Sequence, residues 1–418
     1  MINKDKQFGL LGKTLKYSYS KIIHEKFGKY EYELIELEPE QLSNFVNNGN
    51  YNGYNVTIPY KKEIIKHLDV VDEKAKRIGA VNTVVVRNGK KYGYNTDYDG
   101  MKFMLEYAGI NVYDKNVMVL GSGGTSCTAK TLLSDLNAKK IITVSRTGEI
   151  NYENCYLQTE VQVLINTTPL GMYPNSNQSP VDLSRFPNLE SVVDVVYNPL
   201  KTKLTQQAEK LNIKNVNGLP MLVAQAKYAM ELFTNESHKN QLISAILQEL
   251  KREMTNIVLV GMPGCGKSTI GKLLSKKLNR ELLDTDELVE NIEGCTIPEI
   301  FSAKGEKYFR EVESQAVKKA STGYGKIIST GGGAVVNELN TETLKQNGRI
   351  YYVNREIDKL AMNKRPLSKD RASLEILYSQ RKDKYNDCAD VVIDNNLDIN
   401  KAVEEVLKDY ENTFNQRS

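Results

Sequence analysis

The sequence predicts an α/β protein built on two separate strand–turn–helix units, each belonging to its own parallel sheet. Residues 115–136, KNVMVLGSGGTSCTAKTLLSDL, have the pattern of a strand, a glycine-rich turn and a helix. Residues 255–278, TNIVLVGMPGCGKSTIGKLLSKKL, repeat that order. Short apolar strands of this kind are typical of parallel sheets covered on both faces. Two such units predict at least two α/β domains.

The first glycine-rich turn, GSGGTS, predicts a dinucleotide site because it follows a strand and opens a helix. Glycines let the backbone approach a pyrophosphate, which the positive N-terminus of the helix attracts. The next strand ends in a cation and hydroxyls instead of an acidic residue, which suits a 2′-phosphate and favours NADP(H) over NAD. The predicted contacts are Gly121, Ser122, Gly123, Gly124, Thr125, Ser145, Arg146 and Thr147.

Nearly all of residues 1–250 resembles the shikimate dehydrogenase family. The blocks that carry the resemblance, in the family's order, are NVTIPYKKE (55–63), GAVNTVV (79–85), GYNTDYDG (93–100), INTTPLGMYP (165–174), DVVYNPLKTKL (194–204) and NGLPMLVAQA (217–226). The resemblance implies reduction of 3-dehydroshikimate by NADPH, with Lys61 and Asp97 as the catalytic pair. Their chemistry agrees, because a lysine can polarise or protonate a carbonyl oxygen and an aspartate can hold its charge in place.

The same resemblance implies further contacts to substrate and coenzyme. A small polyhydroxy acid needs many short hydrogen-bonding groups, and those implied are Ser18, Ser20, Thr57, Asn82, Tyr197 and Gln225. Val195 and Gly218 would contact the coenzyme, the latter where a side chain would obstruct the nicotinamide.

The segment GKTLKYSYSKIIH (12–24) departs from the family pattern. It has Thr14 and Lys21 in place of prolines and Tyr17 in place of histidine. Because both serines remain, we expect the segment to keep its carboxylate contacts, in a less rigid loop.

The second glycine-rich turn, GMPGCGKS (261–268), satisfies the P-loop pattern G-x-x-x-x-G-K-[ST] in full. In such a loop the backbone amides wrap phosphates, the lysine reaches the β- and γ-phosphates, and the serine binds Mg²⁺. The pattern therefore predicts ATP and Mg²⁺ as cofactors. The predicted nucleotide contacts are Gly264, Cys265, Gly266, Lys267, Ser268 and Thr269.

Residues downstream of the P-loop predict a kinase of a small metabolite. LLDTDELVE (282–290) places two carboxylates at the end of a strand, one for Mg²⁺ and one for a substrate hydroxyl. STGGGAVV (329–336) predicts a close approach of the backbone to another group. A polar stretch between NKRPLS (363–368) and SQRKDKY (379–385) fits a lid whose cations meet the transferring phosphoryl group.

Residues 255–410 resemble shikimate kinase, with the aspartate pair and the Gly-Glu-x-x-Phe-Arg, Gly-Gly-Gly and Arg-Pro-Leu blocks in family order. The resemblance implies that Lys267, Asp286 and Arg365 are catalytic, and that Arg365 also neutralises charge on the nucleotide phosphates. Ser268 and Asp284 would hold Mg²⁺. The implied shikimate contacts are Asp286, Arg310, Gly332 and Arg381. The segment NREIDKLAMNKRPL (354–367) is shorter than the family's and lacks its adenine-stacking arginine.

These patterns divide the 418 residues into three parts. We expect a two-lobed α/β unit, with a substrate lobe over 1–100 completed by helices in 226–250 and a Rossmann-type NADP lobe over 101–225. A P-loop kinase domain, a parallel sheet flanked by helices, follows over 255–418. The helical, increasingly charged segment 236–254 precedes the junction.

Composition excludes several other classes of protein. The net charge of +4 and the lack of a dense basic block argue against a nucleic-acid partner. No run approaches the ~18 apolar residues of a membrane span. Five cysteines without tight spacing argue against a disulfide framework and for a reducing compartment. The N-terminus lacks the apolar core of a signal peptide, so we expect a cytoplasmic protein; the oligomeric state stays open.

The two halves together predict a bifunctional enzyme in which the product of the first site is the substrate of the second. Two alternatives remain open at this point. One is a quinate-type dehydrogenase joined to another small-metabolite kinase, and the other is that one half is a degenerate binding or regulatory module. Arg146 argues against NAD, and the retained Lys61, Asp97 and Lys267 argue against a degenerate half.

Overall fold

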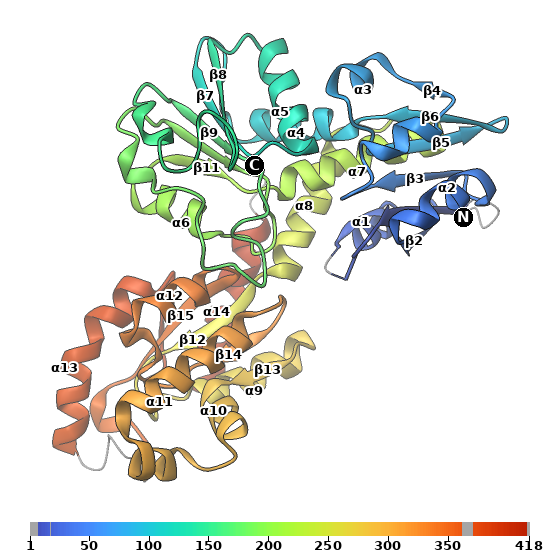
Figure 1. Cartoon of the computed structure of the whole chain (residues 1–418). Helices are drawn as coiled ribbons and strands as arrows, with labels where there is room; N and C mark the ends of the chain where they lie inside the picture. The colour runs from blue at the N-terminus through green and yellow to red at the C-terminus, as the bar shows by residue number, and fades with distance from the viewer. Residues whose placement is uncertain (1–6, 17, 362–370, 416–418) are drawn as a thin grey trace. The chain divides into compact units, whose positions relative to one another are not determined.

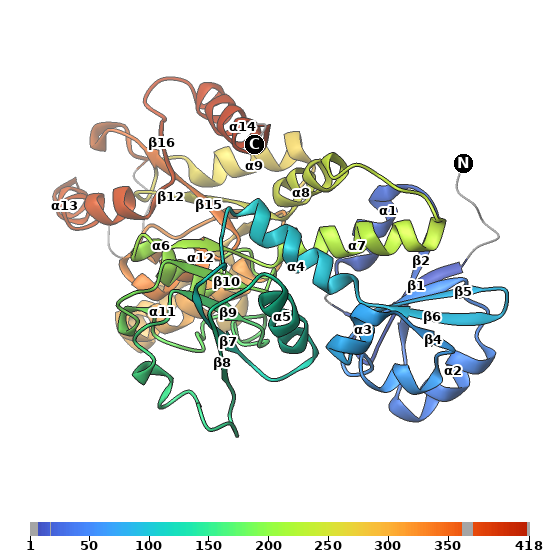
Figure 2. The same ribbon diagram turned by 90° about the horizontal axis from the view of Figure 1, so that it is seen from above.

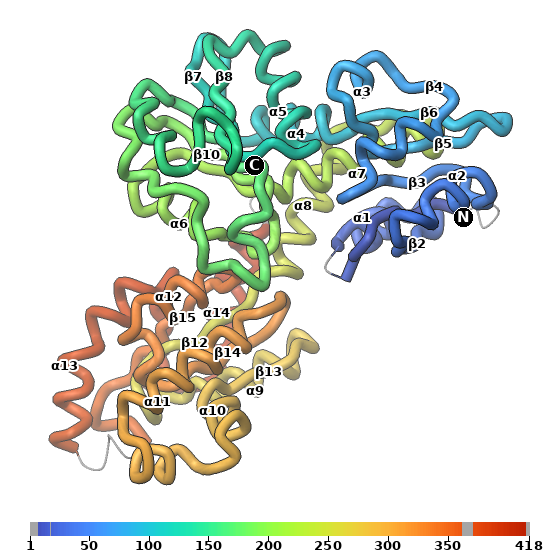
Figure 3. Tube along the Cα trace, in the orientation of Figure 1, coloured from blue at the N-terminus to red at the C-terminus, as the bar shows by residue number. Residues whose placement is uncertain are grey.

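The protein contains three β-sheets (Figure 1). Its structure is a computed structural model, which describes residues 7–16, 18–361 and 371–415. The chain forms two compact units. Unit 1 comprises residues 1–198 and 202–247, and unit 2 comprises residues 199–201 and 248–418. Figure 3 traces the same path as a tube.

The first sheet of unit 1 has the strand order β2-β1-β3-β5-β6-β4 and mixes parallel with antiparallel pairs. Buried side chains such as Leu11, Val56 and Val84 form its core, which explains why these apolar runs pair as strands. Its strands are β1 (Gln7–Gly12), β2 (Glu31–Glu36), β3 (Gly53–Val56), β4 (Val70–Val71), β5 (Thr83–Arg87) and β6 (Lys90–Tyr94).

The second sheet of unit 1 is entirely parallel, in the order β11-β10-β9-β7-β8. The chain order reverses between β7 and β9, and in such sheets ligands bind outside the carboxyl ends of the strands at that point. No strand forms in the fully described segment 145–162, which holds turns and a short 3₁₀ helix. The strands are β7 (Asn116–Leu120), β8 (Lys140–Val144), β9 (Val163–Asn166), β10 (Ser191–Asp194) and β11 (Lys214–Val216).

Helices α4 (Thr96–Tyr107) and α7 (Leu219–Thr234) lie side by side between the two sheets of unit 1, as Figures 1 and 2 both show. Their backbones approach closely at Gly100, where a Cβ atom would lie 2.7 Å from the carbonyl oxygen of Met221. The remaining helices are α1 (Ser20–Phe27), α2 (Leu42–Asn48), α3 (Glu73–Ile78), α5 (Gly124–Asp135), α6 (Lys203–Lys210) and α8 (Gln241–Met254), which crosses the division between the units.

Unit 2 contains a parallel sheet in the order β13-β14-β12-β15-β16, with helices on both faces. Figure 2 shows α9 and α14 on one face and α11 and α12 on the other. The fully buried strand β12 (Asn256–Val260) lies at the centre and leads into the P-loop. Its other strands are β13 (Leu282–Asp284), β14 (Ile327–Ser329), β15 (Gly348–Asn354) and β16 (Val391–Asp394).

The helices of unit 2 are α9 (Lys267–Leu278), α10 (Thr285–Glu293), α11 (Ile297–Ser321), α12 (Glu338–Lys345), α13 (Arg371–Cys388) and α14 (Ile399–Asn415). The predicted fold class, an α/β unit of two lobes followed by a helix-flanked parallel sheet, is confirmed. Each of the five cysteines is a free thiol. Within the described ranges, no helix is both long and apolar enough to cross a membrane.

Candidate functional sites

Lys61 and Asp97 form a short ion pair in unit 1, with 2.6 Å between Nζ and Oδ2. Their side chains are only 17% and 9% exposed, which limits screening by solvent. Lys61 follows β3, and its carbonyl accepts the backbone N–H of Val81. Asp97 lies in the first turn of α4, whose N-terminal N–H groups favour a negative charge. The structure therefore brings the predicted catalytic pair together.

Asn82 is buried beside this pair and is held in one orientation. Its Oδ1 accepts the backbone N–H of Thr96 at 2.7 Å, and its Nδ2 donates to the Thr96 hydroxyl at 3.1 Å. An amide nitrogen carries two hydrogens, so one remains for a ligand. Because Thr96 also begins α4, the same residue sets the positions of Asn82 and Asp97.

The serine segment approaches the coenzyme lobe through a pair of tyrosines. Ser18 accepts the backbone N–H of Ser20 with its hydroxyl. Between them, the ring of Tyr19 meets that of Tyr197 edge to face, with centroids 5.7 Å apart. Burial raises the pKa of Tyr197 to about 12, although the Tyr19 backbone N–H opposes the shift. This pair joins the predicted substrate residues that follow β1 and β10.

The other residues predicted around the substrate lie on flanking elements. Thr57 follows β3 and lies four residues before Lys61, and its backbone N–H donates to the carbonyl of Leu11. Gln225 is buried on α7 and packs against Gly100, one turn beyond Asp97. Of the residues that depart from the family pattern, Thr14 is exposed and Lys21 pairs with Glu25 at 3.7 Å. The departure at Tyr17 lies outside the described residues.

The first glycine-rich turn lies next to Lys61, the predicted catalytic lysine. A Cβ atom on Gly124 would be 3.8 Å from Cδ of Lys61. Gly121 has a φ of 111°, and a Cβ atom there would be 2.7 Å from the Thr167 hydroxyl. Around Gly123, which precedes α5, a Cβ atom would meet nothing within 4 Å. This open approach to a helix N-terminus fits a pyrophosphate.

The remaining predicted coenzyme contacts lie in two groups. Ser122 is exposed and Thr125 is half-buried in the glycine-rich turn. Arg146 and Thr147 are exposed and Ser145 is half-buried after β8, and Arg146 has no carboxylate partner in the described part of the chain. An exposed guanidinium with free N–H donors fits a phosphate group.

Gly218 is required for a reason that the sequence did not indicate. A Cβ atom there would overlap the carbonyl oxygen of Val195, because the two backbones touch. The N–H of Gly218 donates to Val196 at 3.0 Å, which fixes this contact. The contact with Val195 therefore requires a glycine here, and the predicted nicotinamide contact stays a prediction.

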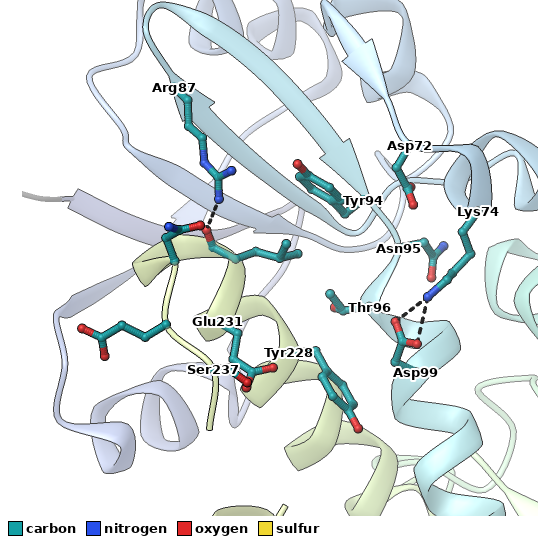
Figure 4. A pocket seen from close by; sticks show the side chains of 13 residues that line it. Asp72, Lys74, Arg87, Tyr94, Asn95, Thr96, Asp99, Tyr228, Glu231 and Ser237 are labelled. Atoms are coloured by element: carbon teal, nitrogen blue, oxygen red, sulfur yellow. Dashed lines mark hydrogen bonds and ion pairs between the residues drawn. The ribbon is translucent and has the colours of Figure 1, made fainter. Parts of the chain in front are cut away.

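A polar cavity of about 480 Å³ lies on the opposite side of the first turn of α4 (Figure 4). Asp99 points into it and binds Lys74 through both carboxylate oxygens, at 2.8 and 2.9 Å. Asp97 and Asp99 are two residues apart on a helix and so face different directions. The cavity is therefore distinct from the Lys61–Asp97 site.

The P-loop of unit 2 is held by tight backbone contacts. Gly261, Gly264 and Gly266 all have positive φ, at 145°, 81° and 103°. A Cβ atom on Gly266 would lie 2.5 Å from Nδ2 of Asn395, which donates to the carbonyl of Cys265. This conformation favours glycine and agrees with the predicted P-loop, in which backbone N–H groups bind phosphate.

Lys267 folds back onto its own loop. Its Nζ donates to the carbonyls of Gly261 and Met262, at 2.9 and 3.0 Å, and lies 3.8 Å from Sγ of the buried Cys265. Ser268 and Thr269 are exposed in the first turn of α9.

Ser268 and Asp284 meet at the carboxyl end of the sheet. The Ser268 hydroxyl donates to Oδ2 of Asp284 at 2.8 Å. A hydroxyl and a carboxylate beside a phosphate loop fit Mg²⁺, which takes few protein ligands and completes its shell with water and phosphate oxygens. The donor set predicted for the metal is therefore assembled.

The three consecutive glycines make room for three different neighbours. A Cβ atom on Gly331 would overlap the carboxylate of Asp286, and one on Gly333 would overlap the guanidinium of Arg310. A Cβ atom on Gly332 would lie 2.7 Å from Cδ of Pro263 in the P-loop. The close approach predicted from these glycines is confirmed, and it brings Asp286, Arg310 and the P-loop to one place.

A buried glutamate, Glu313, binds Arg310 of this site and was not predicted from the sequence. It is 1% exposed and accepts from Nη1 of Arg310 at 2.7 Å. Burial raises its pKa, whereas Arg310 and, more weakly, Arg381 oppose the rise. Its only sequence signal was its place one helical turn after Arg310.

Tyr385 lies one helical turn after Arg381 and contacts the glycines. Arg381 is buried on α13, and the hydroxyl of Tyr385 donates to the carbonyl of Gly332 at 2.5 Å. The predicted shikimate residues Asp286, Arg310, Gly332 and Arg381 thus surround one carboxyl edge of the sheet. The remaining kinase residue, Arg365, lies outside the described residues.

Comparison with known proteins places both halves among enzymes. Residues 10–84 match the family model "Shikimate dehydrogenase substrate binding domain", and residues 263–411 match the model "Shikimate kinase". A shikimate dehydrogenase (NADP(+)) of Clostridium perfringens is 39% identical over 267 residues, which cover 59% of this chain and 98% of that protein.

Two crystal structures are also similar. Shikimate dehydrogenase 1 from Peptoclostridium difficile is 36% identical with a TM-score of 0.56, covering 59% of this chain and 98% of its own. A chorismate mutase/shikimate 5-dehydrogenase fusion protein from Clostridium acetobutylicum is 36% identical with a TM-score of 0.57, covering 60% and 98%.

Proposed function

The chain belongs to the shikimate dehydrogenase family and carries a shikimate kinase domain, and from that premise we propose that it catalyses two consecutive reactions. The first is NADPH-dependent reduction of 3-dehydroshikimate to shikimate. The second is ATP-dependent phosphorylation of shikimate at its 3-hydroxyl. The observation that supports the proposal is that Lys61 pairs with Asp97 in unit 1, while Ser268 of the P-loop bonds Asp284 in unit 2.

In the dehydrogenase reaction, bound NADPH supplies a hydride to the carbonyl carbon. Lys61 donates a proton to the carbonyl oxygen, so that the ketone becomes a secondary alcohol. Asp97 orients the lysine through their 2.6 Å contact. The free hydrogen of Asn82 and the hydroxyls of Ser18, Ser20 and Thr57 bind the carboxylate and hydroxyls of the substrate, together with Gln225 and Tyr197.

The coenzyme-binding residues follow the same reasoning. The turn from Gly121 to Thr125 holds the pyrophosphate of NADP(H), and Arg146 with Ser145 and Thr147 holds its 2′-phosphate. Val195 and Gly218 border the nicotinamide through their backbone.

In the kinase reaction, ATP with Mg²⁺ supplies the phosphoryl group. Asp286 orients the attacking hydroxyl and accepts its proton, while Arg310 and Arg381 bind the carboxylate of shikimate. Lys267 leaves its loop carbonyls to meet the phosphates, and Ser268 with Asp284 holds the metal. Arg365 is the further cation that we assign to the transferring group.

We further propose three domains: 1–100 completed by 226–250 for the substrate, 101–225 for NADP(H) and 255–418 for the kinase. The cytoplasmic location stays a prediction.

One assay tests both activities. Purified full-length chain is given 3-dehydroshikimate, NADPH, ATP and Mg²⁺, while NADPH absorbance and shikimate 3-phosphate are followed together. Lys61→Ala should stop NADPH oxidation yet still phosphorylate added shikimate, and Lys267→Ala should do the reverse.

Oxidation of NADPH without formation of shikimate 3-phosphate would refute the kinase assignment. Activity with quinate and NAD that exceeds activity with shikimate and NADP would refute the dehydrogenase assignment.

A further inference from the structure

A buried carboxylate, that of Asp194, lies at the carboxyl end of β10. Asp194 is fully buried and accepts three hydrogen bonds. They come from the Thr202 hydroxyl at 2.6 Å, Nδ2 of Asn166 at 2.9 Å and the backbone N–H of Val196 at 3.1 Å. Burial raises the pKa of Asp194 to about 6, and the three donors oppose that rise.

The partners of Asp194 fix the loop that follows β9. Asn166, held by Asp194, accepts both the N–H and the hydroxyl of Thr168 on its Oδ1, at 3.0 and 2.7 Å. Next to Thr168, Thr167 lies against Gly121 of the coenzyme turn. A displacement of Asn166 would therefore move the loop that contacts the glycine-rich turn.

The same carboxylate fixes the loop that follows β10. Its bond to Val196 holds the backbone between Val195, which touches Gly218, and Tyr197, which packs on Tyr19. Thr202 closes this loop and begins α6, because its hydroxyl also accepts the N–H of Thr205 at 3.2 Å. One side chain thus anchors both loops at the edge where coenzyme and substrate would meet.

We propose that Asp194 is a positioning residue for the dehydrogenase reaction, which holds the loops after β9 and β10 in the arrangement that binds NADPH and presents Tyr197. The inference rests on the proposed dehydrogenase function. Asp194 does not touch substrate or coenzyme itself; it acts through Asn166 and Val196.

The test compares Asp194→Ala with Asp194→Asn. Alanine removes all three acceptor contacts, and misplacement of reacting groups by about 1 Å can cost on the order of 100-fold in rate. We expect kcat/KM for dehydroshikimate to fall at least tenfold and KM for NADPH to rise. Asparagine should restore most of this, because its oxygen still accepts from Asn166 and Val196 while its amide donates to Thr202.

Two controls separate positioning from general loss of structure. Leu183→Ala removes a buried core side chain of the same lobe that is not among the hydrogen-bond partners of Asp194; it should lower the melting temperature without raising KM for NADPH. The kinase activity of every variant should stay unchanged. If Asp194→Ala does not fold, Thr202→Val, which deletes one donor and keeps the shape, should still raise KM.

An unchanged KM in both Asp194→Ala and Thr202→Val would overturn the proposal. The proposal would also be overturned if Leu183→Ala raised KM for NADPH as much as Asp194→Ala does at the same loss of melting temperature. Coenzyme affinity is also measured without turnover, by NADPH fluorescence, so an inactive wild type would count against the proposed function and not against the role of Asp194.

Discussion

A histidine in the core of the substrate lobe makes the stability of unit 1 depend on pH. His24 is fully buried and stacks on Tyr32, with ring centroids 4.0 Å apart. Its Nδ1 lies 2.6 Å from the Tyr30 hydroxyl. Burial lowers the pKa of His24 from 6.5 to about 3. Below pH 6.5 the unfolded chain takes up a proton that the folded chain refuses, so stability is lost as pH falls from 6.5 towards 3.

The size of the effect follows from the shift in pKa. One pH unit corresponds to 1.36 kcal/mol, so lowering the pH from 7.0 to 5.0 costs about 2 kcal/mol through His24 alone. Asp194 acts in the opposite direction, because its raised pKa of about 6 makes the folded chain take up a proton before the unfolded chain does. The pH dependence of wild-type stability therefore masks the contribution of His24, and a comparison with a variant that lacks the histidine isolates this contribution.

The variant is His24→Gln, which removes the titrating ring. Hydrogen exchange of the β1 amides, measured in urea at pH 7.0 and 5.0, reports the free energy of unfolding of this unit. The advantage of wild type over the variant should shrink by about 2 kcal/mol at the lower pH. Tyr30→Phe, which removes the partner of Nδ1 and keeps the histidine, should retain the wild-type slope. An equal gap at both pH values would refute the burial argument.

Three further substitutions test the proposed sites. Gly333→Ala should displace Arg310 and so raise KM for shikimate by about tenfold or more, because a hydrogen bond to a charged group is worth ~1.5–3 kcal/mol. KM for ATP should stay unchanged, and steady-state kinetics of the kinase measure both constants. Arg146→Gln should raise KM for NADPH by about 10–100-fold and leave KM for NADH unchanged, since only NADPH carries the 2′-phosphate; an equal effect on both coenzymes would contradict the assignment. Asp284→Asn should raise the Mg²⁺ concentration for half-maximal phosphorylation without affecting dehydrogenase activity.

Local patterns predicted the turns and helix starts of both sites. Each glycine-rich turn can be recognised from about ten consecutive residues, because a phosphate site needs small residues with a strand before them and a helix after them. Pairs such as Lys61 and Asp97, 36 residues apart, were matched through family resemblance, since neither residue carries a local signal of its partner.

Residues that act through folding were not predictable in this way. Asp194 binds partners at the end of β9, just after β10 and at the N-cap of α6, and Tyr385 reaches the glycines from 53 residues away. The contact of the Gly218 backbone with Val195 was not predictable either, because it exists only in the assembled lobe. Their roles depend on loops that lie together at the carboxyl ends of strands. The order of strands in the sheet brings these loops together, and the spacing of residues in the sequence does not give that order.

Met262 belongs to both halves of the kinase site. Its carbonyl accepts from Lys267, while its sulfur lies 3.8 Å from the Tyr385 hydroxyl that holds Gly332. A substitution at Met262 is therefore pleiotropic: it disturbs the nucleotide lysine and the glycine run at the same time. In a mutational scan scored by growth, this position would appear intolerant without revealing which ligand had been lost.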